Sequence, residues 1–208
     1  ASEPYLASSR HARLFNKILA SRLGGLIAQH NLIDSCQFAF LPEGGIHEPI
    51  DIVRACWEQS QLADEGSDQK ACYTMFYDIS KAYDTIRWDS ITNALRRIGA
   101  SEDFVSLVSN LHIGTRLAMR TNVKGNITKE VMMYKSIKQG CPLAPLLFVI
   151  VMDELHKQYN EVGGGYKLGK TTITSLGYCD DTTIFASDIS TLRKMDECTR
   201  QFFLKHGL

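Results

Sequence analysis

The chain lacks a net charge, a long apolar run and any paired-cysteine motif. Its 23 Lys and Arg residues balance 23 Asp and Glu residues, so the positive excess typical of nucleic-acid binders is absent. The longest apolar run, 142–152, is too short to cross a bilayer, which predicts no membrane-spanning helix and no membrane partner. The six cysteines show no Cys-x-x-Cys pair and no zinc-type histidine spacing, so they favour reduced thiols and an intracellular location, in the nucleus or cytoplasm.

The charges of each sign are gathered in separate regions. Residues 10–22 and 111–140 are basic, with Glu130 as the one acid among them, whereas 43–68 is acidic apart from Arg54. A length of 208 residues suits one or two domains. Two interpretations of the basic regions stay open, a side that faces nucleic acid and ordinary solvated surface.

Two adjacent carboxylates, Asp180 and Asp181, stand between two apolar, strand-forming segments, 173–177 and 182–186. This pattern predicts a β-hairpin with the carboxylates at its tip. Like charges held so close resist joint ionisation unless a cation offsets their repulsion, so the position favours Mg²⁺, with Mn²⁺ as an alternative. A solvated Asp-Asp turn is the competing interpretation, because turns commonly use aspartate.

A third carboxylate, Asp78, ends the strand-forming run 72–77. If this strand pairs with the hairpin, we expect Asp78 and Asp180 to meet across the ladder. They would then share two metal ions about 3.5 to 4 Å apart, as phosphoryl-transfer sites do.

Periodicity and turn residues predict the other elements. Helices are expected at 13–30, 46–63, 88–98, 103–111 and 145–160, and a hairpin is expected between 116–120 and 131–134. The order is helices first, then a strand, helices, a hairpin, a helix, a hairpin and a helix. That order predicts an α+β fold in which helices back an antiparallel sheet.

Three ordered motifs resemble a known family. They are FYDISKAYD at 76–84, KQGCPLAPLLF at 138–148 and YCDD at 178–181, which look like motifs A, B and C of reverse transcriptases. The Gln-Gly-Cys-Pro-Leu and Lys-Ala-aromatic-Asp forms are most similar to non-LTR (LINE-type) retrotransposon enzymes, with group II intron enzymes as neighbours. Upstream, LFNKILASRL at 14–23 and QFAF at 37–40 resemble the helix and the Gln-x-Gly-Phe element that precede motif A.

The resemblance implies a polymerase palm with a partial helical fingers region. Residues 1–70 would form the partial fingers, and 71–208 the palm with motifs A, B, C and the start of motif D. The Arg-Pro fingers segment expected before the first helix is replaced at 3–10, and no thumb follows 202–208. We therefore expect a fragment, or a trimmed relative, of a larger polymerase.

The resemblance also assigns roles to candidate site residues. Asp78, Asp180 and Asp181 would be catalytic and would bind metal, with the carbonyl of Ile79 as a further ligand. Tyr83 stands where the family has an aromatic steric gate beneath the sugar, which predicts a preference for deoxynucleotides; a core tyrosine is the alternative.

Further candidates would bind nucleotide or nucleic acid. Gln139 and Gly140 resemble the motif B turn at the nucleotide, although a purely structural turn before a helix stays open. Lys81 would meet phosphate, or it would merely pair with Asp84. The expected nucleic-acid contacts are basic residues from both basic regions: Arg10, Arg13, Lys17, Arg116 and Arg120.

The predicted function is an RNA-directed DNA polymerase that uses an RNA template, a DNA primer, dNTP and Mg²⁺. We expect the full-length parent to be active and this fragment alone to be weak or inactive, and a homodimer is a further expectation. Two alternatives stay open: an inactive or domesticated domain that binds RNA or protein, and an RNA-directed RNA polymerase. Tyr83 argues against the second, because a gate residue should block the ribose 2′-hydroxyl.

Overall fold

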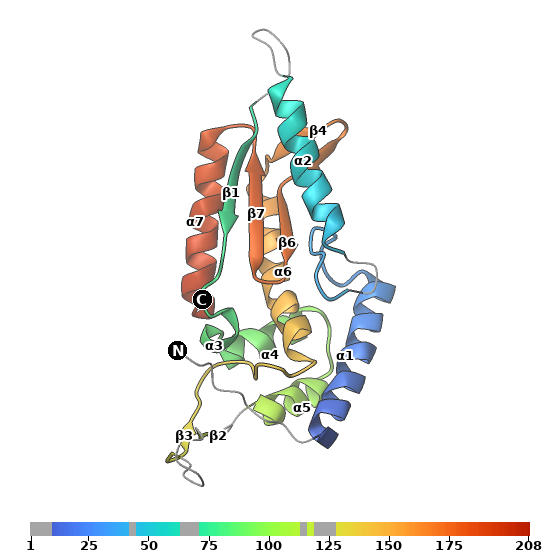
Figure 1. Cartoon of the computed structure of the whole chain (residues 1–208), viewed down its shortest axis with the longest axis vertical. Helices are drawn as coiled ribbons and strands as arrows, with labels where there is room; N and C mark the ends of the chain where they lie inside the picture. Colours follow the sequence, from blue (N-terminus) through green and yellow to red (C-terminus); the bar gives the residue numbers. More distant parts are fainter. Residues whose placement is uncertain (1–9, 42–44, 63–70, 113–115, 119–127) are drawn as a thin grey trace.

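The computed structural model describes residues 10–41, 45–62, 71–112, 116–118 and 128–208. They form a central antiparallel sheet with helices on both faces and a helical region below one end of it (Figure 1). The elements in chain order are α1 (Arg10–His30), α2 (His47–Gln61), β1 (Tyr73–Tyr77), α3 (Ala82–Thr85), α4 (Trp88–Arg97), α5 (Glu102–His112), β2 (Arg116–Leu117), β3 (Val131–Met132), α6 (Ala144–Val162), β4 (Tyr166–Leu168), β5 (Thr171–Ile173), β6 (Ser175–Tyr178), β7 (Asp181–Ala186) and α7 (Ile189–His206).

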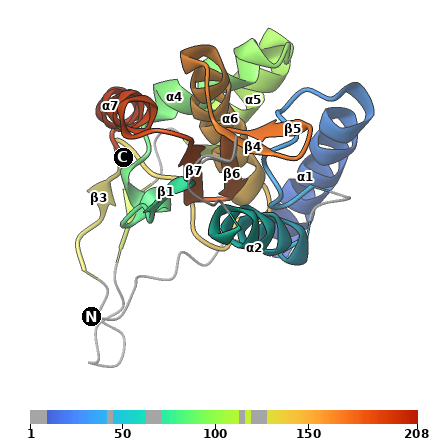
Figure 2. The same ribbon diagram turned by 90° about the horizontal axis from the view of Figure 1, so that it is seen from above.

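The main sheet has the strand order β1-β7-β6, and both neighbouring pairs are antiparallel. Helices α6 and α7 cover one face and α2 lies across the other (Figure 2). The register pairs Tyr77 with Thr182 and Tyr178 with Asp181. The sheet therefore has one end at which β1 and β6 finish and β7 begins.

Successive side chains of β1 point to opposite faces of the sheet. The Tyr77 hydroxyl donates to Asp196 Oδ1 of α7 at 2.8 Å. The preceding residue, Phe76, faces the opposite side and is 67% exposed. The α7 side of the sheet is thus part of the core, while the other side stays accessible near the strand ends.

The centre of the core is α6. Every residue from Leu146 to Met152 is buried, as expected for a helix segment that is apolar around its whole circumference. The apolar run 142–152 is therefore a core helix. No helix in the part of the chain that the structure describes is long and apolar enough to cross a membrane.

A segment near the N-terminus extends the same sheet. Gln37 forms an isolated parallel bridge with Gly177 of β6. The Phe38 N–H donates to the Gly177 carbonyl at 2.9 Å, and the Gly177 N–H donates to the Cys36 carbonyl at 2.8 Å. The residues that follow α1 are thereby attached to the strand that leads into the Asp180 turn.

The predicted α+β class and the predicted helices are confirmed, with bounds that differ by a few residues. The hairpin between β2 and β3 is present as two residue pairs, Arg116 with Met132 and Leu117 with Val131; its expected turn lies outside the described residues. The sequence did not predict α3 or the hairpin of β4 and β5. These elements have three or four residues each, too few for periodicity to distinguish them from loops.

Candidate active site

The structure brings the three predicted carboxylates to the same end of the main sheet. Asp78 directly follows β1, Asp180 lies in the turn between β6 and β7, and Asp181 begins β7. Because Tyr77 pairs with Thr182, the next position places Asp78 level with Asp181. Asp180 lies in the turn, beyond the last paired position of the ladder, so the expectation that it meets Asp78 stays a prediction.

The three carboxylates interact electrostatically. The pKa of Asp181 is raised above its ordinary value, first by partial burial and then by the charges of Asp180 and Asp78. None of the three forms an ion pair with Lys, Arg or His among the described residues. Uncompensated carboxylates are the donor set that a hard divalent cation prefers.

The carboxylates are neighbours but do not form a closed cage. Among residues 10–41, 45–62, 71–112, 116–118 and 128–208, no three His, Cys, Asp or Glu side chains are arranged to hold a metal ion. The side chain of Ile79 is buried in the main core, at 6% exposure. Any contribution of Ile79 to cation binding would therefore come from its backbone carbonyl.

The turn that carries Asp180 is fixed by a distant side chain, Gln37. Cys179 has φ 61°, in the left-handed region that non-glycine residues rarely adopt. Its N–H donates to Gln37 Oε1 at 3.1 Å, and the Ala39 N–H donates to the same oxygen at 3.2 Å. Gln37 is itself buried, so this contact stabilises the strained residue from inside the protein.

Close packing behind the turn requires glycine at position 177. A Cβ built on Gly177 would lie 2.8 Å from Gln37 Nε2 and closer still to the ring of His156. His156 Nδ1 lies 2.9 Å from Ser175 Oγ. Complete burial lowers the pKa of His156 to about 4, so the ring is neutral near pH 7.

An ion-pair network around a buried aspartate supports the segment that carries Gln37. Asp153 of α6 is completely buried, pairs with Arg97 of α4, and lies 2.9 Å from Lys157 Nζ. Its Oδ1 accepts from the Asp34 N–H at 2.6 Å. The network ties two helices to the chain just before Gln37, which fixes that segment relative to the core.

Tyr83 lies against the carboxylate turn. Its hydroxyl is 3.3 Å from Cys179 Sγ, and its half-buried ring packs on Phe148 of α6 with centroids 5.5 Å apart. Burial raises the pKa of Tyr83 well above its ordinary value, so the hydroxyl stays protonated. The candidate gate and the candidate metal ligands therefore belong to one site.

The motif B segment is hydrogen-bonded to the Tyr83 segment. The Ile137 N–H donates to the Tyr83 carbonyl at 2.8 Å, and Gln139 Nε2 donates to Asp84 Oδ1 at 3.2 Å. Gly140 has φ 75°, which explains the glycine, and nothing lies within 4 Å of a Cβ built there. The structure thus brings Gln139 beside motif A and leaves open space at Gly140.

Lys81 begins α3 in a left-handed conformation, with φ 57°. The Asp84 N–H donates to its carbonyl at 2.8 Å, so the backbone of Lys81 caps this short helix. Its side chain is exposed and forms no ion pair with Asp84 among the described residues.

The basic candidates on α1 lie beside the motif B segment rather than among the carboxylates. Arg10, Arg13 and Lys17 are exposed on α1. That helix contributes Ala12 and Asn16 to a small cavity shared with Gln139, so α1 lies nearer to motif B than to the carboxylates.

The β2–β3 hairpin carries Arg116, a further basic candidate. Arg116 pairs with Glu130 at 3.2 Å on this hairpin, which projects from the lower end of the molecule (Figure 1). Arg120 lies outside the described residues.

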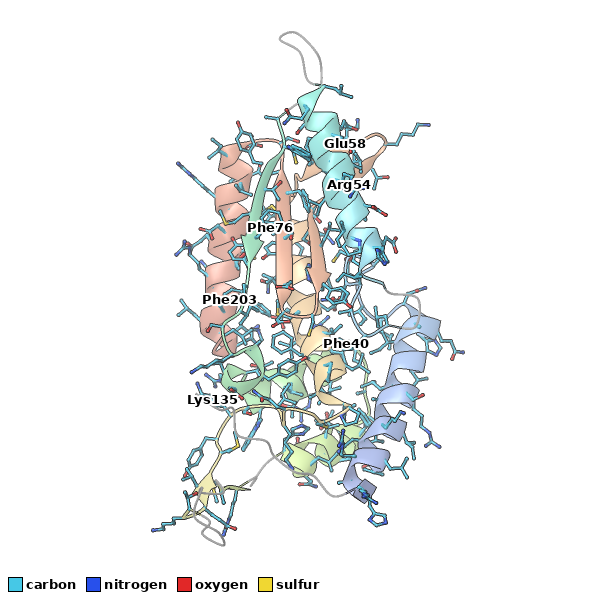
Figure 3. All side chains as sticks on the ribbon, in the orientation of Figure 1. Phe40, Arg54, Glu58, Phe76, Lys135 and Phe203 are labelled. Carbon is cyan, nitrogen blue, oxygen red and sulfur yellow. The ribbon has the colours of Figure 1, made fainter. Side chains whose placement is uncertain are left out.

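An apolar cleft of about 330 Å³ adjoins Asp181 on the accessible face of the sheet. Phe76, the last but one residue of β1 (Figure 3), lines it together with Tyr178 and with Ile50 of α2. Asp181 therefore lies where an apolar wall meets solvent.

Comparison of the sequence with known proteins identifies a family and several relatives. A family profile described as reverse transcriptase (RNA-dependent DNA polymerase) matches residues 6–208. The retrovirus-related Pol polyprotein from type-2 retrotransposable element R2DM of Drosophila melanogaster is 32% identical over 206 residues, which is 99% of this chain and 18% of that polyprotein. The Pol polyprotein from type-1 retrotransposable element R2 of Nasonia vitripennis is 28% identical over 184 residues, which is 88% of this chain and 17% of that polyprotein.

Solved structures share the fold. Apo telomerase from Candida tropicalis, truncated from its C-terminal domain, superposes with a TM-score of 0.62 at 14% identity and covers 94% of this chain and 38% of that one. Telomerase from Candida albicans, in complex with a TWJ fragment of telomeric RNA, gives a TM-score of 0.59 at 10% identity, over 92% and 33% of the two chains. Since the family profile covers nearly the whole sequence and the relatives are R2 retrotransposon proteins, this chain belongs to the reverse transcriptase family, of the non-LTR kind.

Proposed function

We propose that the protein containing this chain is an RNA-directed DNA polymerase, which joins dNTP to the 3′-hydroxyl of a DNA primer on an RNA template. The chain spans 18% and 17% of the two relatives described above, so activity is proposed for the whole protein. The observation that supports it most is that Asp78, Asp180 and Asp181 lie together at one end of the sheet, beside Tyr83.

Reverse transcriptases depend on divalent metal ions, and we propose Mg²⁺ here, with Mn²⁺ as an alternative. Asp78, Asp180 and Asp181 would hold the ions, with the Ile79 carbonyl as a further ligand. When bound, such ions lower the pKa of the primer hydroxyl and neutralise the leaving pyrophosphate. The 3′-oxygen forms a bond to the α-phosphorus as the bond from that phosphorus to pyrophosphate breaks.

The remaining site residues would position the nucleotide. The ring of Tyr83, held against Phe148, would occupy the space that a ribose 2′-hydroxyl needs. Gln139 would orient the base or template from its place beside Asp84, and the open space at Gly140 would admit the nucleotide. The exposed side chain of Lys81 would meet phosphate.

We further propose that residues 1–70 act as partial fingers and 71–208 as the palm. Basic residues at their surfaces would contact the template and primer backbones: Arg10, Arg13, Lys17, Arg116 and Arg120. All six cysteines lie in the described part and are free thiols, which supports action inside the cell, in the nucleus or cytoplasm. A homodimer is proposed without an assigned surface.

The test is primer extension on RNA by the full-length protein with Asp180→Asn, which removes one charge and keeps the shape. Removing a charged group that stabilises the transition state costs about 3 kcal/mol, so we expect about a 100-fold lower rate. Asp103→Asn, at an exposed aspartate in the first turn of α5, is the matched control and should extend normally.

Two outcomes would contradict the proposal. Equal rates for Asp180→Asn and wild type would remove the metal-ligand assignment. Extension with NTP but not dNTP would replace the proposal with an RNA-directed RNA polymerase.

A further inference from the structure

Three contacts hold Tyr83 in place. Its hydroxyl lies 3.3 Å from Cys179 Sγ, its face packs on Phe148, and its carbonyl accepts from the Ile137 N–H at 2.8 Å. The backbone bond and the packing on Phe148 do not fix the hydroxyl end of the ring. In the described part of the chain, the hydroxyl end makes its polar contact with Cys179.

Burial and a backbone hydrogen bond fix the position of Cys179. Its side chain is buried at 5% exposure, and its backbone is held by the bond from its N–H to Gln37 Oε1 at 3.1 Å. The backbone that carries the sulfur is therefore anchored to the core through Gln37, while the thiol also interacts with the neighbouring Asp180. A hydrogen bond to an anchored atom restricts the tyrosine more than a bond to a mobile surface group would.

The contact depends on the side chain at position 179. Alanine there would offer no side-chain hydrogen-bonding atom, so the Tyr83 hydroxyl would have no partner at this position. The cysteine thus supplies an interaction that a small apolar residue cannot.

We propose that Cys179 is a specificity-determining positioning residue, which holds the ring of Tyr83 through the hydroxyl-to-sulfur contact and so sharpens the choice of dNTP over NTP. This inference rests on the proposed function, because it concerns the sugar selectivity of that same site. Cys179 acts through Tyr83 and does not touch the nucleotide.

The experiment measures the ratio of kcat/KM for dNTP to kcat/KM for the matching NTP in primer extension by the full-length protein. We expect Cys179→Ala to lower this ratio about three- to tenfold, the range expected from the net free energy of one weak hydrogen bond. Tyr83→Phe, which removes the same contact from the other side, should lower it equally. The double variant should match either single variant, because both changes break one interaction.

Two further variants separate the contact from general effects of substitution. Cys179→Ser keeps a small hydrogen-bonding side chain and should restore the ratio to within about twofold of wild type. Cys198→Ala removes a thiol that also makes one hydrogen bond, to Gln158 Oε1 at 3.3 Å on the α6–α7 side, and should leave the ratio unchanged. If Cys179→Ala fails to fold, Tyr83→Phe tests the proposal alone, since the ring and its packing are kept.

The outcomes distinguish this inference from the proposed function. Normal extension with an unchanged ratio in Cys179→Ala or Tyr83→Phe, or additive effects in the double variant, would overturn the role of Cys179 and leave the polymerase proposal standing. Wild-type protein that extends no primer would overturn the proposed function and this inference with it.

Discussion

Replacement of Gln37 by alanine should destabilise the protein more than its position in a loop suggests. The side chain is 2% exposed, and its Oε1 accepts from the N–H groups of Cys179 and Ala39. Alanine would leave both buried donors without a partner. Each unsatisfied buried group costs about 1 to 3 kcal/mol, so we expect a loss of about 3 kcal/mol in the free energy of unfolding. That is a large fraction of the roughly 5 to 15 kcal/mol of a typical domain.

The assay is urea unfolding of the 208-residue chain, followed by circular dichroism. Gln37→Met fills most of the same volume without an acceptor. It should therefore lose nearly as much free energy of unfolding as Gln37→Ala, which would show that the loss comes from the hydrogen bonds and not from a cavity. Gln201→Ala, at an exposed glutamine of α7 whose side-chain amide donates to Glu197 Oε1, should stay within about 0.5 kcal/mol of wild type. A loss below about 1 kcal/mol in both Gln37 variants would refute the view that this side chain fixes the Asp180 turn.

Two other predictions concern the same buried region. Gly177→Ala should lower the free energy of unfolding by at least about 2 kcal/mol in the same urea assay, because its Cβ would overlap the side chains of Gln37 and His156; near-wild-type stability would show that these groups move aside easily. His156 should make the fold sensitive to acid. Its pKa is about 4 in the folded protein and about 6.5 when unfolded, so the unfolded state binds more protons between these values and stability falls as the pH is lowered through this window, by about 2 kcal/mol from pH 7 to pH 5. His156→Gln should remove this part of the pH dependence, and an unchanged slope would contradict the assignment.

The sequence determined the local parts of the site because each is set by neighbouring residues. Strand-forming segments on both sides of Asp180 and Asp181 are enough to predict the hairpin, since its partners are a few residues apart. The apolar run that became the buried part of α6 likewise identified the core helix. The motif order then gave the family, which the profile match over residues 6–208 bears out.

Only the tertiary structure decided how these parts meet. The bond between Gln37 and Cys179 joins residues 142 positions apart, and the contact of Tyr83 with Cys179 spans 96 positions. The pairing of β1 with β7, which brings Asp78 beside the start of β7, joins strands that are far apart in the sequence. A buried His156 or Asp153 looks in sequence like any polar residue on a helix. Local periodicity carries no record of such partners, because the free energy that selects them comes from burial and hydrogen bonding between segments that meet only after the chain has folded.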